Sequence, residues 1–203
     1  MSTLPTPADV LAFWIGNAAD SPEAAGEQHK LWFGKSAETD ADIRARFLPL
    51  LEILSHFPAA EDWAGRGPRE RLAAIIVLDQ FSRNLFRGEA RAFDQDDLAL
   101  LLCKDGIALG QDRELTEAER IFFYLPLEHS EAPEDQAASV AKFAELVATS
   151  REGFRGLTES TLKYAEAHKD VIDRFGRFPH RNAALGRATT DDEADWLAEG
   201  GGF

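Results

Sequence analysis

Arginine residues are concentrated in two segments of an otherwise acidic chain. Residues 66–91 contain six arginines against three acidic residues, and residues 174–187 contain four arginines and no acidic residue. These segments carry net charges of +3 and +4, while the rest of the 203-residue chain carries −21 and the total is −14. Because the planar guanidinium group matches the two oxygens of a carboxylate or phosphate, this contrast predicts a site for an anionic small molecule or a peptide carboxylate.

Within the first segment, polar side chains form a stripe along a predicted helix. At about 100° per residue, Asp79, Gln80, Arg83, Asn84 and Arg87 fall within an arc of about 140°. Such a stripe is either a structural network built on an Asp79–Arg83 pair one helical turn apart or part of a ligand site. Solvated faces commonly use Glu and Lys, whereas this one uses Asp, Gln, Asn and Arg, so both interpretations stay open.

The second segment ends a predicted helix and continues into a constrained loop. Gly176 favours the end of the helix, and Pro179 keeps Phe178 out of the helical region of backbone space. Constrained loops commonly carry binding residues, although arginines here could instead cap the C-termini of helices. The ligand-binding candidates from this segment are Arg174, Arg177, His180, Arg181 and Asn182.

A third group of polar residues follows an apolar helical run. Residues 128–131, with the sequence Glu-His-Ser-Glu, predict a set of exposed polar side chains in which His129 lies between carboxylates. Such a histidine is either a general base with a raised pKa or a hydrogen-bonded residue at a helix end. His129 and Glu131 join the ligand-binding candidates, and His129 and His180 are the candidate catalytic residues if the protein is an enzyme.

Other kinds of chemistry have weaker support in the sequence. His129, Glu131, His168 and His180 contain metal-ligating atoms, but their spacing matches no metal-binding motif. We therefore predict no metal and no cofactor. The sequence also lacks the Walker A, nucleophile-elbow, His-Glu-x-x-His and Cys-x-x-Cys motifs. The single cysteine, Cys103, lies among leucines and predicts a buried, inert thiol.

The elements that must position these residues are all predicted to be helices. Helix starts are indicated by capping residues or early prolines at Thr6, Ser21, Gly67, Thr116 and Thr190. Apolar residues recur at helical spacing between these starts, and no segment shows the alternation of a strand. The prediction is an all-α fold of about eight or nine helices joined by short loops. Because no linker interrupts the pattern, a single domain over residues 1–203 is expected.

Composition restricts the class of protein and its partners. A hydrophobic fraction of 44% fits an ordinary globular chain, and a net charge of −14 argues against nucleic-acid binding and against anionic membranes. The N-terminus lacks the basic and apolar regions of a signal peptide, and no apolar run is long enough to span a membrane. We therefore expect a cytoplasmic protein without nucleic-acid or membrane partners, and the sequence leaves the oligomeric state open.

Three long motifs give the chain a resemblance to a known family. They are residues 78–88 (LDQFSRNLFRG), 119–131 (ERIFFYLPLEHSE) and 175–182 (FGRFPHRN). In this order they resemble a widespread, mostly bacterial family known as a conserved domain of unknown function. The resemblance implies a tetratricopeptide-repeat-like stack of helical hairpins, and it implies no assigned activity, substrate or cofactor. Ser82 stands where the resemblance leads us to expect proline.

Three classes of function fit these features. The first is binding of an anion in an Arg- and His-rich pocket, which requires the two arginine segments to meet in the fold. The second is an enzyme, either a hydrolase or a transferase, that uses the same pocket with His129 or His180 as its acid–base group. The third is a protein-interaction scaffold, because stacks of helical hairpins often present a binding groove.

Overall fold

Helices begin at the capping signals read from the sequence. In the computed structural model, which describes residues 4–202, Thr6 and Thr190 each form a capping box with the acidic residue three positions later. The Ser21 hydroxyl accepts a hydrogen bond from the amide of Ala24, and Pro22 occupies the first helical position. These contacts satisfy amide groups that lack partners in the first turn of a helix.

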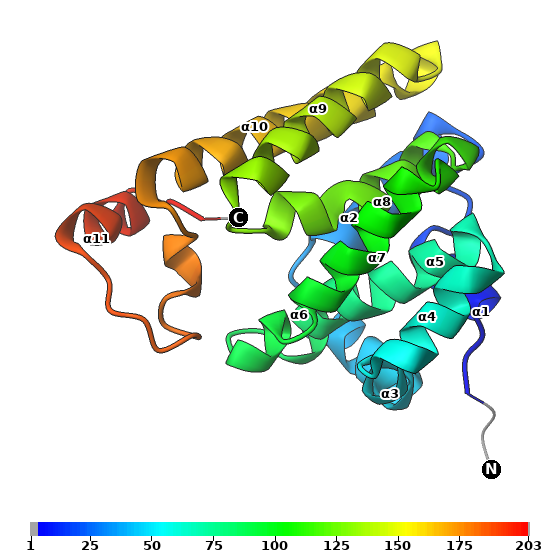
Figure 1. Cartoon of the computed structure of the whole chain (residues 1–203), viewed down its shortest axis with the longest axis horizontal. Coiled ribbons are helices and arrows are strands. Elements are labelled where there is room, and N and C mark those ends of the chain that lie inside the picture. The colour runs from blue at the N-terminus through cyan, green and yellow to red at the C-terminus, as the bar shows by residue number, and fades with distance from the viewer. Residues whose placement is uncertain (1–3, 203) are drawn as a thin grey trace.

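The residues that the structure describes contain helices and no strand, so the predicted all-α class is confirmed (Figure 1). The α-helices are α1 (Pro7–Trp14), α2 (Pro22–Phe33), α3 (Ala37–Leu54), α4 (Phe57–Arg66), α5 (Pro68–Ile75), α6 (Ser82–Leu85), α7 (Asp96–Ala108), α8 (Glu117–His129), α9 (Pro133–Thr149), α10 (Arg155–Phe175) and α11 (Asp191–Ala198). Short 3-10 segments are η2 (Ala90–Phe93), η3 (Gln111–Glu114), η4 (Glu152–Phe154) and η5 (Pro179–Arg181).

The long helix predicted from residue 67 to 87 differs from the expectation. It consists of α5, a π-helical segment η1 (Ile76–Phe81) and α6. A π-helical turn shifts hydrogen bonding from i→i−4 to i→i−5 and is found mostly at functional sites. Because Asp79 and Gln80 lie in η1, the ideal helical wheel does not give their directions. A separate helix α4, which the apolar pattern did not predict, adds to the eight or nine expected helices.

The core centres on aromatic side chains that surround η1. Phe81 is fully buried, and its ring lies 4.7 Å from that of Phe47 and 5.4 Å from that of Trp14, centroid to centroid. Trp14 in turn lies 5.8 Å from Phe122 of α8, in an edge-to-face arrangement. Edge-to-face aromatic contacts add to the stability gained from burial. All six residues of η1 are buried, so the fold holds Asp79 inside the protein.

Helices that are neighbours in sequence pack as antiparallel pairs. The longest such contact joins α9 to α10, and α8 packs against α9 (Figure 1). This arrangement is consistent with the helical-hairpin stack that the family resemblance implies. A second, small apolar cluster forms at the end of α10, where Val171, Ile172 and Phe178 pack with Phe175 and Trp196.

Two further predictions about the chain can be compared with the structure. Cys103 is fully buried, and burial raises the pKa of its thiol, so the expectation of an inert cysteine is met. Within residues 4–202, no helix combines the length and apolarity needed to cross a bilayer.

Candidate functional site

Buried and half-buried polar side chains, most of them ionisable, converge where η1, α6, α7, α8, α10 and η5 meet. The group, which we name the Asp79 cluster, consists of Asp79, Gln80, Arg83, Asp96, Glu128, His129, His168, His180 and Arg181. All of these side chains are buried or half-buried. Interior charges are costly unless they are paired, so each pairing in the cluster bears on what the cluster does.

Asp79 is the best-partnered carboxylate of the cluster and is 1% exposed. Its Oδ1 lies 2.8 Å from Nδ1 of His129 and 3.1 Å from the Arg83 guanidinium. Gln80 donates a hydrogen bond to Oδ2 at a distance of 2.6 Å. Burial by itself would raise the pKa of Asp79, but the charge of Arg83 and the His129 contact outweigh burial and lower it. The carboxylate is therefore ionised at neutral pH.

Arg83 and Arg181 approach the same carboxylate from the two arginine segments. Arg83 donates hydrogen bonds to both oxygens of Asp96, each at a distance of 3.0 Å. Arg181 donates to Oδ2 of Asp96 at a distance of 3.4 Å. The two arginine segments therefore meet in the fold, as anion binding requires. Arg83 and Asp96 are each about one-fifth exposed, so this edge of the cluster reaches solvent.

Arg181 is poorly partnered for a buried cation. It is 6% exposed, its Nε–H donates to no acceptor among the described residues, and its side chain makes a long hydrogen bond to Asp96. The guanidinium lies 4.8 Å from the ring of Phe93 and 4.5 Å from that of Phe178. Burial and the neighbouring charge of Arg83 lower the pKa of Arg181 to about 10. A buried guanidinium with unused donors calls for an explanation.

The three histidines of the cluster are neutral at pH 7. Burial lowers the pKa of His129, with the charge of Arg83 acting in the same direction. Burial lowers the pKa of His168 to about 3 and that of His180 to about 4. Since Asp79 is ionised, a neutral His129 donates its Nδ1 hydrogen to that carboxylate and carries its lone pair on Nε2. Of the two interpretations of His129, the structure does not support the one with a raised pKa, because desolvation exceeds the effect of the carboxylate.

Three predicted site residues lie outside the cluster and have contacts of their own. Asn84 and Arg87 both bind Asp40 of α3. Arg174 is exposed and lies over the ring of Phe175. These three side chains are thus separated from Arg83 and Arg181, although the helical wheel placed Asn84 and Arg87 on one stripe with Asp79.

The remaining predicted residues hold the C-terminal loop in place. Glu131 accepts hydrogen bonds from both terminal nitrogens of Arg187 and from the amide of Phe178. Arg177 binds Glu193 through two nitrogens, and Asn182 donates to the same carboxylate. These pairs fix the position of η5 and thereby the positions of His180 and Arg181.

Sequence reasoning missed two acidic members of the cluster. Glu128 was expected to be exposed after Pro126, but α8 continues to His129 and Glu128 is 3% exposed. Burial, together with the charge of Asp79, raises the pKa of Glu128 to about 8. Asp96 lies just beyond the first motif and has no periodic relation to Arg83, so only the turn through η2 brings it back to that arginine.

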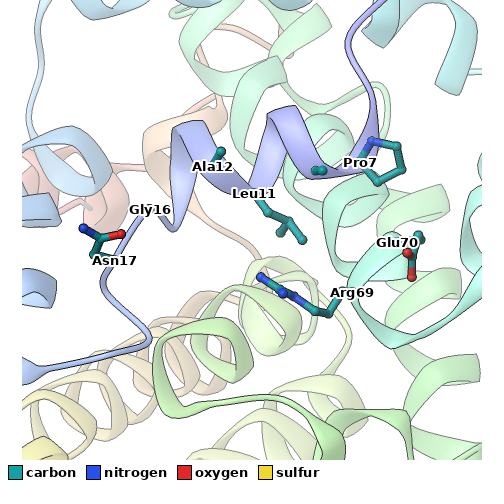
Figure 2. Close-up of a pocket in the computed structure, with 8 residues that line it drawn as sticks. Pro7, Leu11, Ala12, Gly16, Asn17, Arg69 and Glu70 are labelled. Atoms are coloured by element: carbon teal, nitrogen blue, oxygen red, sulfur yellow. The ribbon is translucent and has the colours of Figure 1, made fainter.

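A cavity on the surface lies away from the cluster. It has a volume of about 380 Å³ and is lined by residues of α1, the turn after it and the start of α5, including Leu11, Gly16, Arg69 and Glu70 (Figure 2). Arg69 already pairs with Glu119 over 3.0 Å. Since the cavity contains no histidine and no buried ionisable group, we assign the candidate site to the Asp79 cluster.

Comparison with known proteins supports the family resemblance that the three motifs indicated. A solved structure of a protein of unknown function from Agrobacterium tumefaciens matches with a TM-score of 0.78 at 34% identity, over 95% of this chain and 97% of that chain. No curated protein matches. A family described as bacterial protein of unknown function (DUF924) matches residues 10–201. The chain therefore belongs to this family, as the resemblance of its motifs predicted.

Proposed function

We propose that the Asp79 cluster binds a small anionic molecule through a carboxylate or phosphate group. The observation that carries the proposal is Arg181, a buried guanidinium whose Nε–H has no acceptor among the described residues and whose hydrogen bond to Asp96 is 3.4 Å long. Buried cations in proteins are normally paired and fully hydrogen-bonded. An anion beside Arg181 would supply the missing acceptors in the bidentate geometry that arginine favours.

The neighbours of Arg181 fit the same role. Arg83 places a second guanidinium against Asp96, at the edge of the cluster that reaches solvent. His129 and His180, both neutral, provide ring nitrogens close to these charges. We therefore assign contact with the anion to these four side chains. Asp79 and Gln80 position them, and the paired residues Arg87, Arg177, Asn182 and Glu131 have structural roles.

The ligand is a small molecule or a peptide carboxylate rather than nucleic acid or a membrane surface. The cluster is small and largely buried, while the rest of the chain is strongly acidic. Polyanions would be repelled by that acidic body, whereas a small anion needs to meet only the local positive charge.

The test measures thermal unfolding of the protein with a set of anions at constant ionic strength. The set comprises inorganic phosphate, a phosphomonoester, acetate, succinate and an N-acetylated dipeptide. At 100 times its Kd, a ligand stabilises the folded state by about 2.7 kcal/mol, which corresponds to a rise in Tm of about 5–10 °C for a chain of this size. We expect at least one member of the set to raise Tm by this amount.

Two variants show whether such a rise comes from the cluster. Arg181→Met replaces the guanidinium by a side chain that still packs against Phe93 and Phe178, and it should abolish the rise. Arg174→Met removes an exposed arginine of the same segment and should leave the rise unchanged. An absence of any shift over the whole set, or an equal shift in Arg181→Met, would contradict the proposal.

A second candidate function is acid–base catalysis on the bound anion. The specific observation is the pair formed by Asp79 and His129, whose atoms lie 2.8 Å apart. A buried carboxylate that orients a neutral histidine is the arrangement that general bases use. Screening phosphoesters and acyl esters for turnover tests this candidate. Turnover that disappears in His129→Gln supports it, and no turnover of any ester in the screen argues for binding alone.

A further inference from the structure

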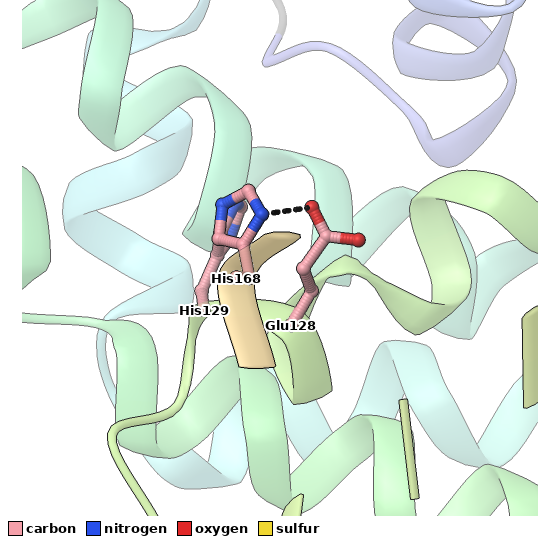
Figure 3. Close-up of side chains that lie close together, drawn as sticks. All are labelled: Glu128, His129 and His168. Atoms are coloured by element: carbon pink, nitrogen blue, oxygen red, sulfur yellow. Dashed lines mark ion pairs between the residues drawn. The ribbon is translucent and has the colours of Figure 1, made fainter. Parts of the chain in front are cut away.

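Two histidines and a glutamate of the Asp79 cluster bring their ligating atoms together. Glu128 and His129 are the last two residues of α8, and His168 lies in α10 (Figure 3). One ligand atom from each residue can be chosen so that all lie within 4.8 Å of one another. Glu128 and His168 are buried and His129 is half-buried, so this is an interior group rather than a surface acidic patch.

Each histidine ring is oriented by a hydrogen bond from its Nδ1. Nδ1 of His129 lies 2.8 Å from the Asp79 carboxyl group, and Nδ1 of His168 donates to the backbone carbonyl of Tyr164 at a distance of 2.8 Å. A carbonyl oxygen accepts hydrogen bonds and cannot donate them, so the Nδ1 of His168 carries the proton. In both rings the lone pair is therefore on Nε2. Metal-bound histidines show this same pattern, in which a carboxylate or carbonyl accepts the hydrogen of the non-ligating nitrogen.

Glu128 lacks the hydrogen bonds that a buried carboxyl group normally has. Its Oε1 lies 3.2 Å from Nδ1 of His168, a nitrogen that already donates to Tyr164. Its Oε2 is buried and has no hydrogen-bond partner among the described residues. Interior carboxyl groups are usually satisfied by several donors or by a cation. The described residues offer Glu128 only the His168 hydrogen that Tyr164 already accepts.

We propose that Glu128, His129 and His168 bind a divalent transition-metal ion, with Zn²⁺ as the best match. Two imidazole nitrogens and one carboxylate oxygen are a donor set that suits Zn²⁺ and its first-row neighbours, whereas Mg²⁺ and Ca²⁺ prefer oxygen ligands. The ion would give Glu128 its missing partner. On coordination Glu128 would release its proton to solvent, and the negative charges of Glu128 and Asp79 would then balance the charge of the ion.

The ligands must move closer together to close around the ion. Donor atoms around tetrahedral Zn²⁺ are about 3.4 Å apart, whereas the ligating atoms of this group lie within 4.8 Å of one another. The His168 ring must also present its Nε2 to the ion, because Oε1 of Glu128 now faces its Nδ1. Three protein ligands leave an open coordination position, which is typical of sites that take water or a substrate rather than of structural zinc sites. This site uses Glu128, whereas the sequence pointed to Glu131, which instead binds Arg187.

The proposal is tested by titrating the full-length protein with Zn²⁺ after dialysis against a chelator. Calorimetry should show one ion bound per chain, and thermal unfolding should shift to higher temperature. Co²⁺ should bind at the same position and give the visible absorption of a nitrogen–oxygen site, while Mg²⁺ and Ca²⁺ should produce no effect at matched concentrations.

Three variants distinguish this site from surface binding. Glu128→Gln keeps the shape of the side chain, and His168→Gln removes one ring. Each should weaken Zn²⁺ binding by about 100-fold or more, since loss of a supporting residue alone costs up to that amount. His29→Gln changes an exposed histidine of α2 and should bind as the unchanged protein does. Circular dichroism confirms that each variant is folded, and the Co²⁺ spectrum of Glu128→Gln decides the outcome if His168→Gln does not fold.

The metal proposal does not depend on the anion proposal, and the two can fail separately. Arg181→Met should bind Zn²⁺ normally while losing its response to anions. The metal site is refuted if one equivalent of Zn²⁺ does not bind, or if Glu128→Gln binds it with unchanged affinity.

Discussion

Arg181 differs from the other arginines of its segment in how it is paired. Arg177 binds Glu193 through two nitrogens, and Arg187 binds Glu131 in the same way. Arg181 shares Asp96 with Arg83, at the longest distance of the group. An arginine whose hydrogen-bond donors are all satisfied by protein groups indicates a structural role. A buried arginine with unused donors indicates a place where a ligand binds.

The Arg177–Glu193 pair predicts how acid affects stability. Hydrogen bonds from Arg177, and then from the amide of Thr190, lower the pKa of Glu193 to about 2. Its ordinary value is near 4.5, so the unfolded chain takes up a proton at a higher pH than the folded chain. The pair therefore stabilises the fold above about pH 4.5, and this contribution is lost as pH falls toward 2.

The measurement for Glu193 is the urea midpoint between pH 2.5 and 6. Glu193→Gln should be less stable than the unchanged protein at pH 6 and should approach it at low pH. Glu159→Gln, which alters an exposed glutamate of α10, should follow the unchanged protein throughout. A constant difference between Glu193→Gln and the unchanged protein over this range would show that the pair does not set the acid response.

At the scale of elements, α7 packs closely against α5 and α8 at Gly106. A Cβ at this position would lie 2.6 Å from Cδ of Arg71 and closer still to the ring of Phe123. Both neighbours are buried, and Arg71 is held by hydrogen bonds to Gln111 and to the carbonyl of Leu102. Overpacking of this kind costs about 1–3 kcal/mol, which exceeds the gain of about 1 kcal/mol from replacing a helical glycine by alanine.

Gly106→Ala should therefore lower the free energy of unfolding by about 1 kcal/mol. The matched change is Gly26→Ala in α2, where a Cβ meets no atom within 4 Å. That variant should gain up to about 1 kcal/mol, since only the helix propensity changes. Urea unfolding measures both, and a Gly106→Ala protein as stable as Gly26→Ala would show that α7 and α8 pack less closely than the structure has them.

The sequence predicted most of the helices because their start signals are local. The capping boxes at Thr6 and Thr190, and Ser21 with the proline that follows it, all begin helices as expected. The π-helical segment η1 was not predictable, because its buried aromatic contacts come from distant helices. The residues of the polar stripe along the predicted helix therefore have different partners in the structure. Arg83 binds Asp96, and Arg87 binds Asp40.

The site was only partly predictable for a related reason. Residue types identified Arg83, His129 and Arg181, since guanidinium groups suit the binding of carboxylates and phosphates and imidazole groups suit acid–base chemistry. The partners Asp96 and Glu128 depend on which residues the fold brings together, and an aspartate or glutamate in an acidic chain carries no distinguishing mark. Charge counting therefore found the cations and missed the carboxylates that face them.

At the scale of the whole molecule, the chain is proposed to behave as one domain. The apolar cluster at the end of α10 is separate from the main core, but Arg181 binds Asp96 and Glu131 accepts the amide of Phe178, so polar contacts link the two. We expect a single unfolding transition in urea, with circular dichroism and tryptophan fluorescence coinciding.

The fluorescence of Trp196 reports on the apolar cluster at the end of α10. Its contribution is the difference between the fluorescence of the unchanged protein and that of Trp196→Phe. It should follow the same transition as the rest of the chain. An earlier transition of that signal would divide the chain into two units.

The uneven distribution of charge along the sequence corresponds to a particular arrangement of the arginines in the structure. The two arginine segments, which stand out against a chain of net −14, meet at Asp96. Most of their arginines are neutralised where they meet carboxylates from elsewhere in the chain. The local positive charge left for a ligand therefore rests on Arg181 rather than on the whole of either segment.

The most direct measurement of this central claim observes the side-chain Nε–H signal of Arg181 by NMR, in protein labelled with ¹⁵N-arginine, during titration with an anion that raises Tm. The proposal predicts a saturable shift of the Arg181 signal, with Arg177 unchanged because Glu193 already binds it. An Arg181 signal that stays fixed while the anion stabilises the protein would place the ligand elsewhere and contradict the proposed site.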